Sequence, residues 1–277
     1  MSCHGPMRKQ RLDTLLAERG LFASRSRAAA SVMAGEVCVG HERRRAQKPG
    51  ELVAVDAQLS VAERPRYVSR GGIKLENALG ATGLDVRGRR ALDVGASTGG
   101  FTDCLLQHGA AEVVAVDVAY GELAYALRGD PRVQVMERTN ARSLSPAALP
   151  PSAAAGLGPP DLAVVDVSFI SLAKVLPAVL GCLSDAYDVL ALVKPQFEVG
   201  REVAARGHGV VRDAEDRRAA LIAAALAARE LGAAVRGLHS SGLPGPKGNR
   251  ETFLWLGPRG QAGEVADIER MAREVEP

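Results

Sequence analysis

Ala91-Leu-Asp-Val-Gly-Ala-Ser-Thr-Gly-Gly-Phe101 is the stretch of sequence that decides the fold. Its first residues read as a buried strand, which is followed by a glycine turn and the start of a helix. Phe101, Leu105 and Leu106 form the apolar face of that helix, and residues 112–117 read as a second strand. The order of strand, glycine turn, helix and strand predicts a Rossmann-type unit.

The glycine turn has the spacing Asp-x-Gly-x-x-x-Gly-Gly, which differs from the Gly-x-Gly-x-x-Gly of dinucleotide folds. A dinucleotide rests its pyrophosphate on the helix N-terminus, and Asp93 would repel that group. The same carboxylate would attract a ligand that carries an ammonium and a sulfonium group. Asp117 ends the next strand, 22 residues after Gly95, where an acidic residue can bind ribose hydroxyls. These features favour S-adenosylmethionine over a turn that binds no ligand.

The residues expected to contact this cofactor lie in the glycine turn and after the neighbouring strands. Asn140 is expected to meet the adenine, and Phe169 to pack in the cofactor pocket. The full set is Asp93, Gly95, Ser97, Thr98, Gly99, Gly100, Phe101, Asp117, Asn140 and Phe169.

The composition fits a protein of one large and one small domain, with 277 residues and only 4% aromatic residues. A core of Ala, Val and Leu suits a parallel sheet that is buried on both faces. The four cysteines are scattered, which indicates neither a disulfide framework nor a metal site and suggests a cytoplasmic location. The N-terminus lacks the apolar stretch of a signal peptide, and the longest helical apolar run, 219–228, is too short to span a membrane. The sequence does not predict an oligomeric state.

Alternating strand and helix patterns predict an α/β fold with a seven-stranded, mostly parallel sheet, preceded by a small α+β domain. The seven strands are expected at 91–95, 113–117, 133–136, 162–167, 189–193, 234–239 and 252–256. A helix is expected from Gly72 to about Thr82, a surface loop over 143–160, and a glycine-rich flap over 206–211. The predicted domains are 1–62 and 70–277, with a linker at 63–69 where Pro65 disfavours helix.

The first 74 residues are basic, with fourteen Lys and Arg against seven Asp and Glu. Apolar spacing predicts a helix over 11–18, and Ser24 is a candidate cap for a second helix that runs to about Ala34. Strands are expected at 36–40 and 52–55. Arginines in the first turn of the second helix lie at the positive end of the helix dipole, which is unfavourable. This placement is better explained if the arginines bind a phosphate than if they form a solvated face. The predicted RNA-binding residues are Arg11, Arg25, Arg27, Arg43, Arg44, Arg45 and Lys48.

Four charged residues are expected at the edge of the sheet where a doubly wound fold binds its ligand. Lys74 begins the helix before the first strand, and Glu251 precedes the last strand. Asp166 and Lys194 end the fourth and fifth strands. Charged residues next to apolar strands are rarely buried unless they pair, so a cluster of two lysines and two carboxylates is favoured over four unrelated surface charges.

Two family resemblances rest on motifs along the chain. Arg11-Leu-Asp-Thr-Leu-Leu, Gly20-Leu-Phe-Ala-Ser-Arg-Ser-Arg-Ala and Gly35-Glu-Val-Cys-Val resemble the S4 RNA-binding domain, which usually has Asn-Gly where this chain has Gly40-His41. The whole chain resembles the TlyA (haemolysin A-like) family of ribosomal RNA 2′-O-methyltransferases, an S4 domain followed by an FtsJ-like domain. The motifs are Ser69-Arg-Gly-Gly-Ile-Lys74, the glycine turn, 137–142, Asp166-Val-Ser-Phe-Ile-Ser-Leu172, 192–200 and Pro244-Gly-Pro-Lys-Gly-Asn-Arg-Glu251.

This resemblance implies a catalytic tetrad of Lys74, Asp166, Lys194 and Glu251 and 2′-O-methylation of cytidine in 16S or 23S ribosomal RNA, without a metal. A ribose hydroxyl is a poor nucleophile, so a base must act on it. Lys194 is the candidate, because a second ammonium and partial burial would favour its neutral form. Asp166 would orient Lys194, and Glu251 would hold Lys74 or the ribose.

Two other functions stay open on the sequence. One is an RNA-binding or ribosome-assembly protein with an inactive Rossmann domain, against which the complete tetrad argues. The other is a membrane-active haemolysin, which fits poorly with a chain that has no expected membrane span. A pseudouridine synthase can also carry an S4 domain, but its catalytic domain is not a Rossmann sheet.

Overall fold

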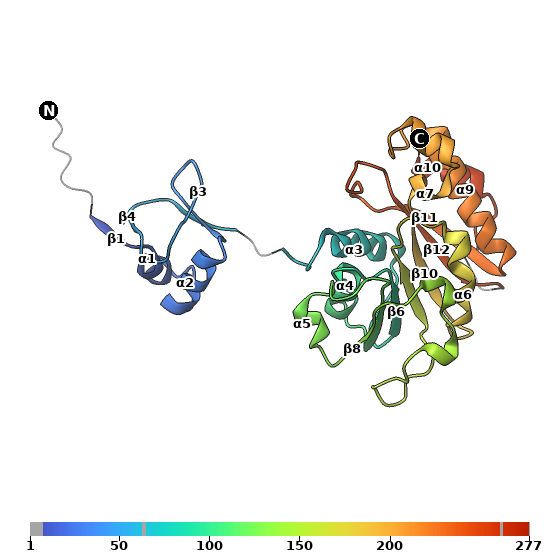
Figure 1. Ribbon diagram of the computed structural model, residues 1–277, viewed down its shortest axis with the longest axis horizontal. Coiled ribbons are helices and arrows are strands. Elements are labelled where there is room, and N and C mark those ends of the chain that lie inside the picture. The colour runs from blue at the N-terminus through green and yellow to red at the C-terminus, as the bar shows by residue number, and fades with distance from the viewer. Residues whose placement is uncertain (1–7, 63–64, 261–262, 277) are drawn as a thin grey trace. The chain divides into compact units, whose positions relative to one another are not determined.

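The computed structural model describes residues 8–62, 65–260 and 263–276. The chain divides into two compact units between Pro65 and Arg66. This division lies inside the predicted linker 63–69, of which residues 63 and 64 are outside the described residues. Residues 65–69 form no helix or strand, and the first helix of the second unit begins at Arg70. Figure 1 shows the helices and strands of each unit.

The first unit is a small α+β domain. Its elements are β1 (Lys9–Arg11), α1 (Leu12–Glu18), α2 (Arg25–Met33), β2 (Val37–Val39), β3 (Arg44–Arg45), β4 (Leu52–Ala54) and β5 (Leu59–Val61). Strand β1 pairs antiparallel with β4, and β2 lies between β3 and β5 in a three-stranded antiparallel sheet. Leu12, Leu15 and Leu16 of α1 pack with Ala28 and Val32 of α2 in the core.

Local signals explain the two helices of this unit. The hydroxyl of Ser24 accepts a hydrogen bond from the backbone N–H of Arg27 at 3.3 Å, as expected of an N-cap. Gly20 and Gly35 follow the two helices with φ of +72°, a conformation that favours glycine. Gly40 likewise has φ of +81°, so the turn that departs from the usual S4 sequence still places glycine at a left-handed position.

The second unit contains a seven-stranded sheet in the order β11-β12-β10-β9-β6-β7-β8. Its strands are β6 (Arg90–Val94), β7 (Glu112–Val116), β8 (Val133–Met136), β9 (Leu162–Val165), β10 (Asp188–Val193), β11 (Ala233–Ser240) and β12 (Thr252–Pro258). Strands β6 to β10 run parallel, and β12 is antiparallel to both β10 and β11. The predicted mostly parallel seven-stranded α/β sheet is therefore confirmed.

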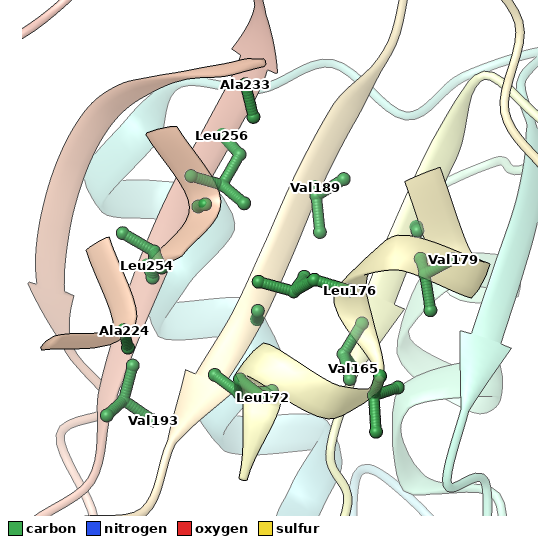
Figure 2. Packing of buried hydrophobic residues seen from close by; sticks show 14 of the residues in the cluster. Val165, Leu172, Leu176, Val179, Val189, Val193, Ala224, Ala233, Leu254 and Leu256 are labelled. Atoms are coloured by element: carbon green, nitrogen blue, oxygen red, sulfur yellow. The ribbon is translucent and has the colours of Figure 1, made fainter. Parts of the chain in front are cut away.

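Helices cover both faces of this sheet. They are α3 (Arg70–Thr82), α4 (Gly100–Gln107), α5 (Tyr125–Arg128), α6 (Leu176–Gly181), α7 (Pro195–Glu198), α8 (Arg201–Arg206), α9 (Ala214–Glu230) and α10 (Ile268–Val275), with 3-10 turns at Ala141–Ser143, Pro146–Ala148 and Leu172–Lys174. One core lies between the sheet and α3, α4 and α5, and another lies between the sheet and α6, α9 and α10. Figure 2 shows the second core, where Leu176 and Val179 of α6 lie near Val165 and Val189. Burial on both faces accounts for the nearly continuous apolar runs of the strands.

Two segments that were expected to be loops are anchored by side chains. In the predicted surface loop 143–160, the guanidinium of Arg90 donates to the carbonyl of Pro150 at 2.6 Å, and the carboxylate of Glu112 accepts from the backbone N–H of Ala153 at 2.7 Å. In the predicted flap 206–211, Asn249 donates to the carbonyl of Gly209 at 2.7 Å. Asn249 also accepts from the backbone N–H of Val211 at 2.9 Å.

The parallel direction of strands β6 to β10 creates a ligand site at one edge of the sheet. The carboxyl ends of β6 to β10 meet at this edge, and the strand order reverses between β6 and β9. Open α/β sheets bind ligands in the crevice at such a reversal. Because β12 is antiparallel and Thr252 pairs with Val193, Glu251 reaches the same edge as Lys194.

Candidate active site

The glycine turn after β6 is shaped by close backbone contacts. Gly95 has φ of +88°, and a Cβ there would lie 2.5 Å from the carbonyl oxygen of Asp166. A Cβ on Gly100 would lie 2.9 Å from the backbone nitrogen of Gly72, so this glycine lets α4 approach α3. Asp117 accepts hydrogen bonds from the backbone N–H groups of Ser97 at 2.7 Å and Ala119 at 2.8 Å. Asp117 therefore fixes the turn as well as facing the ligand site.

Two adjoining pockets follow this turn, and together we call them the cofactor crevice. One, of about 470 Å³, is lined by Arg70, Lys74, Thr98, Phe101 and others. The other, of about 510 Å³, is lined by Asp117, Asn140, Phe169 and others. Both include Gly95, Ser97 and Asp166. An acidic side chain and a polar amide at one end, and helix N-termini at the other, suit a nucleoside that carries an amino-acid tail.

Most of the predicted cofactor residues line this crevice: Gly95, Ser97, Thr98, Gly100, Phe101, Asp117, Asn140 and Phe169. Gly99 instead serves as the N-cap of α4, where a Cβ would lie 2.3 Å from a methyl carbon of Leu127. The side chain of Asn140 accepts from the backbone N–H of Arg142 at 3.0 Å, so its oxygen also caps a 3-10 turn.

Asp93 lies deeper than its position after the strand suggested. Its side chain is fully buried, and one carboxyl oxygen accepts from the hydroxyl of Thr102 at 2.6 Å. Within residues 8–62, 65–260 and 263–276, the other oxygen has no hydrogen-bond partner. Burial raises the pKa of Asp93 to about 7, with the nearby charge of Asp166 adding to the rise. Asp93 is thus a buried group under the glycine turn and not a residue of the crevice wall.

The four residues of the predicted tetrad line a third pocket, which we call the tetrad pocket and which has a volume of about 500 Å³. They form two ion pairs. Nζ of Lys74 lies 2.5 Å from Oε2 of Glu251, and Nζ of Lys194 lies 2.6 Å from Oδ1 of Asp166. Lys74 and Asp166 also line the cofactor crevice, so the two cavities meet at these side chains.

The tetrad pocket includes Ser168, Gln196, Phe197 and Asn249, which the sequence analysis did not single out, together with Phe169, which also lines the cofactor crevice. Nζ of Lys194 donates to the hydroxyl of Ser168 at 2.9 Å. The rings of Phe169 and Phe197 contact each other with centroids 5.1 Å apart, and Phe169 is 91% exposed with φ of +64°. Gln196, Lys247 and Asn249 also line this pocket. Ser168 could have been found from its position two residues after Asp166. The Phe169–Phe197 contact could not, because the two rings follow different strands.

The predicted RNA-binding residues of the first unit are all exposed or partly exposed. Several are held by acceptors: Arg11 and Arg25 pair with Asp13, Arg44 pairs with Glu51 at 3.0 Å, and Nε of Arg45 donates to the carbonyl of Gly35 at 2.7 Å. Arg43 has φ of +50° in the turn before β3. Asp13, the acidic partner of Arg25, lies in α1. Its negative charge offsets the unfavourable interaction of Arg25 with the positive end of the α2 dipole.

Among the residues that the structure describes, no group of three or more His, Cys, Asp and Glu could hold a metal ion. None of the helices in those residues is both long enough and apolar enough to cross a membrane.

Comparison with known proteins identifies the second unit. The sequence profile of the FtsJ-like methyltransferases matches residues 67–258, more than half of the chain. The chain belongs to this family. The S4 domain profile matches residues 10–58 in the first unit. Membership confirms the resemblance drawn from the motifs and makes S-adenosylmethionine the cofactor.

Individual relatives cover both units. The chain is 51% identical over 252 residues to the 16S/23S rRNA (cytidine-2′-O)-methyltransferase TlyA of Mycobacterium tuberculosis, with 90% of each chain covered. It is 38% identical to Hemolysin A of Brachyspira hyodysenteriae over 73% of this chain and 81% of that protein. A solved structure of a candidate hemolysin from Streptococcus thermophilus has a TM-score of 0.70 and 40% identity, covering 98% of this chain and 96% of that one.

Proposed function

We propose that this methyltransferase modifies ribosomal RNA on the 2′-oxygen of cytidine, in the cytoplasm, where that RNA resides. The observation that carries the proposal is the meeting of the cofactor crevice with the tetrad pocket at Lys74 and Asp166. The activity for which the Mycobacterium tuberculosis relative is named and the S4 match supply the substrate class.

S-adenosylmethionine, when bound, supplies a methyl group on a positively charged sulfur. The residues proposed to hold it are those that line the cofactor crevice. Asp117 would bind the ribose hydroxyls, since it lines the crevice. Arg70 and Thr98 line the opposite end and suit the carboxylate of an amino-acid tail.

The tetrad pocket is proposed to hold the target ribose. Once Nζ of Lys194 has released its own proton to solvent, the neutral amine would take the proton of the 2′-hydroxyl while the oxygen forms its bond to the methyl carbon. The cofactor would supply the methyl group and keep the electron pair of the carbon–sulfur bond, so the positive charge would end on Lys194. Asp166 then stabilises that ammonium, because it lies 2.6 Å from Nζ. Ser168 limits the directions in which Nζ can point.

Lys74 and Glu251 are proposed to position the ribose and to shape the floor of the tetrad pocket. Their ion pair is buried, and Lys74 lines both cavities. A fixed floor favours the reaction because alignment of oxygen, carbon and sulfur contributes strongly to methyl transfer.

The test measures transfer of labelled methyl from S-adenosylmethionine to 16S and 23S rRNA. The parent protein should label at least one of the two, and Lys194→Met should lower the rate by at least about 100-fold, as expected for loss of a general base. Lys174→Met is the matched control, since Lys174 is an exposed lysine of the same unit outside the tetrad pocket. Binding of rRNA without any methyl transfer would instead support the RNA-binding alternative.

A further inference from the structure

Asp13 is a buried carboxylate in the middle of the predicted RNA-binding arginines. It lies in the first turn of α1, and its side chain is only 5% exposed. Most RNA-binding surfaces avoid acidic groups, because the phosphate backbone is negative. Asp13 nevertheless lies between two of the predicted RNA-binding arginines.

Two arginines from different elements share this carboxylate. Arg11 donates from Nη2 to Oδ2 of Asp13 at 2.7 Å and from Nε to Oδ1 at 3.1 Å. Arg25, from the first turn of α2, donates from Nε to the same Oδ2 at 3.1 Å. The side chains of Arg11 and Arg25 are still 49% and 58% exposed. The guanidinium groups are thus held side by side with part of each facing solvent.

Gly50 leaves space for the guanidinium of Arg11 on another side. A Cβ on Gly50 would lie 2.9 Å from Nη1 and 3.1 Å from Cζ of Arg11. The backbone on either side is anchored, because the N–H of Leu12 donates to the carbonyl of Glu51 and the N–H of Asp13 donates to the carbonyl of Pro49, both at 2.9 Å. The absence of a side chain at Gly50 therefore leaves room for the guanidinium of Arg11.

We propose that Asp13 and Gly50 preorganise Arg11 and Arg25 as a clamp for an RNA phosphate. The proposal rests on the proposed RNA-binding function of the first unit and adds a positioning role for a carboxylate. A planar guanidinium that is already fixed loses less conformational freedom when it binds a phosphate. The two guanidinium groups more than neutralise the negative charge of Asp13, so ordering two long side chains in advance outweighs its repulsion of a phosphate. The arginines hold the pKa of Asp13 well below its usual range, so the carboxylate stays ionised.

Asp13 also has a structural role that the test must separate. Its Oδ1 accepts from the backbone N–H of Thr14 at 2.8 Å, and a negative charge in the first turn of a helix is favourable. Asn keeps the size of Asp and an acceptor for Thr14, but it loses the charge that holds two guanidinium groups. Asp13→Asn is therefore the informative substitution.

The experiment measures binding of labelled 23S rRNA to the full-length protein at several salt concentrations. Simple charge counting predicts that Asp13→Asn binds RNA more tightly, since it removes a negative charge. The clamp predicts the opposite, an affinity about fivefold weaker. The salt dependence should keep its slope, because both arginines remain. Asp56→Asn is the matched control: Asp56 is an exposed carboxylate of the same unit, and its loss should leave RNA affinity unchanged or slightly higher.

Gly50→Ala tests the clamp without changing any charge. The new methyl group would displace the guanidinium of Arg11, a flexible group, so the fold should persist while RNA affinity falls. This variant keeps the test decisive if Asp13→Asn melts at a much lower temperature. Parental or tighter RNA binding by folded Asp13→Asn, or parental binding by Gly50→Ala, would overturn the clamp.

The arginine variants separate this inference from the proposed function. Arg11→Ala and Arg25→Ala should each weaken binding and lower the log–log salt slope by about one unit on the duplex rule. If both bind RNA like the parent, then RNA binding by this surface is wrong. If they weaken binding and Asp13→Asn does not, then the surface binds RNA and only the clamp is wrong.

Discussion

Breaking the Lys74–Glu251 ion pair should affect stability and catalysis in ways that can be separated. The side chain of Lys74 is 9% exposed and that of Glu251 is 1% exposed, with 2.5 Å between the charged atoms. Lys74→Met would leave the Glu251 carboxylate in this buried position without its counter-charge. Such a group has few ways to recover hydration, so the folded state should lose stability.

The expected magnitude follows from burial. Removing one partner of a buried ion pair costs about 3–5 kcal/mol. For a unit of this size, about 1 kcal/mol shifts the melting temperature by roughly 2–4 °C, so Lys74→Met should melt roughly 6–20 °C lower. Replacing both partners with apolar residues of similar volume is often nearly neutral. The double variant Lys74→Met with Glu251→Leu should therefore recover most of the lost stability.

Catalysis should not recover with stability. If the pair positions the ribose, the double variant will fold like the parent and still transfer methyl groups poorly. The assay combines thermal unfolding with transfer of labelled methyl to rRNA for the two single variants and the double variant. A single variant as stable as the parent would refute the burial argument. A stable double variant with parental methyl transfer would refute the positioning role.

The remaining predictions concern residues on both sides of that pair. Asp166→Asn should lower the rate of methyl transfer at least about 100-fold, because Lys194 loses the carboxylate 2.6 Å away; a parental rate would remove Asp166 from the mechanism. Asp117→Ala should weaken S-adenosylmethionine binding in calorimetry, since it removes the proposed ribose ligand and the acceptor for the Ser97 N–H; an unchanged affinity would contradict the assignment. Burial raises the pKa of Asp93 to about 7, so the protonated form is the one that the folded state favours. The free energy of unfolding should therefore fall as pH rises from about 4 through 7, and urea unfolding of Asp93→Asn should show a weaker fall; identical pH profiles would exclude this role.

The main sheet could be predicted because its strands carry long apolar runs. Ala91–Val94 and Val113–Val116 are buried on both faces, and the glycine turn between them marks the ligand edge. Strands β1, β3 and β5 of the first unit were missed, since they are two or three residues long and have exposed or half-buried side chains. These segments are strands because each pairs with a neighbouring strand, and their residue pattern alone does not indicate it.

The members of the site and the pairing of Asp166 with Lys194 could be predicted from the sequence, and Lys74 was one of two expected partners of Glu251, but the depth of Asp93 could not be predicted. The ends of parallel strands meet at one edge, so Asp166 and Lys194 could be placed together from the sequence. The pairing of Lys74 with Glu251 joins residues 177 apart and depends on the antiparallel direction of β12. Asp93 was expected to face the cofactor, but it is buried under the glycine turn. Its position at the end of a strand does not reveal how deeply the side chain lies. The sharing of Asp13 by Arg11 and Arg25 depends on the packing of α1 against α2.

The position of the added methyl group tests the central claim most directly. A site of two lysines and two carboxylates suits deprotonation of a hydroxyl, and the tetrad pocket meets the cofactor crevice at Lys74 and Asp166. The measurement is nuclease digestion of rRNA treated with the protein and S-adenosylmethionine, followed by mass spectrometry of the nucleosides. Cytidine with the extra methyl on its ribose is the expected product, and a methyl group on a base would rule out the proposed reaction.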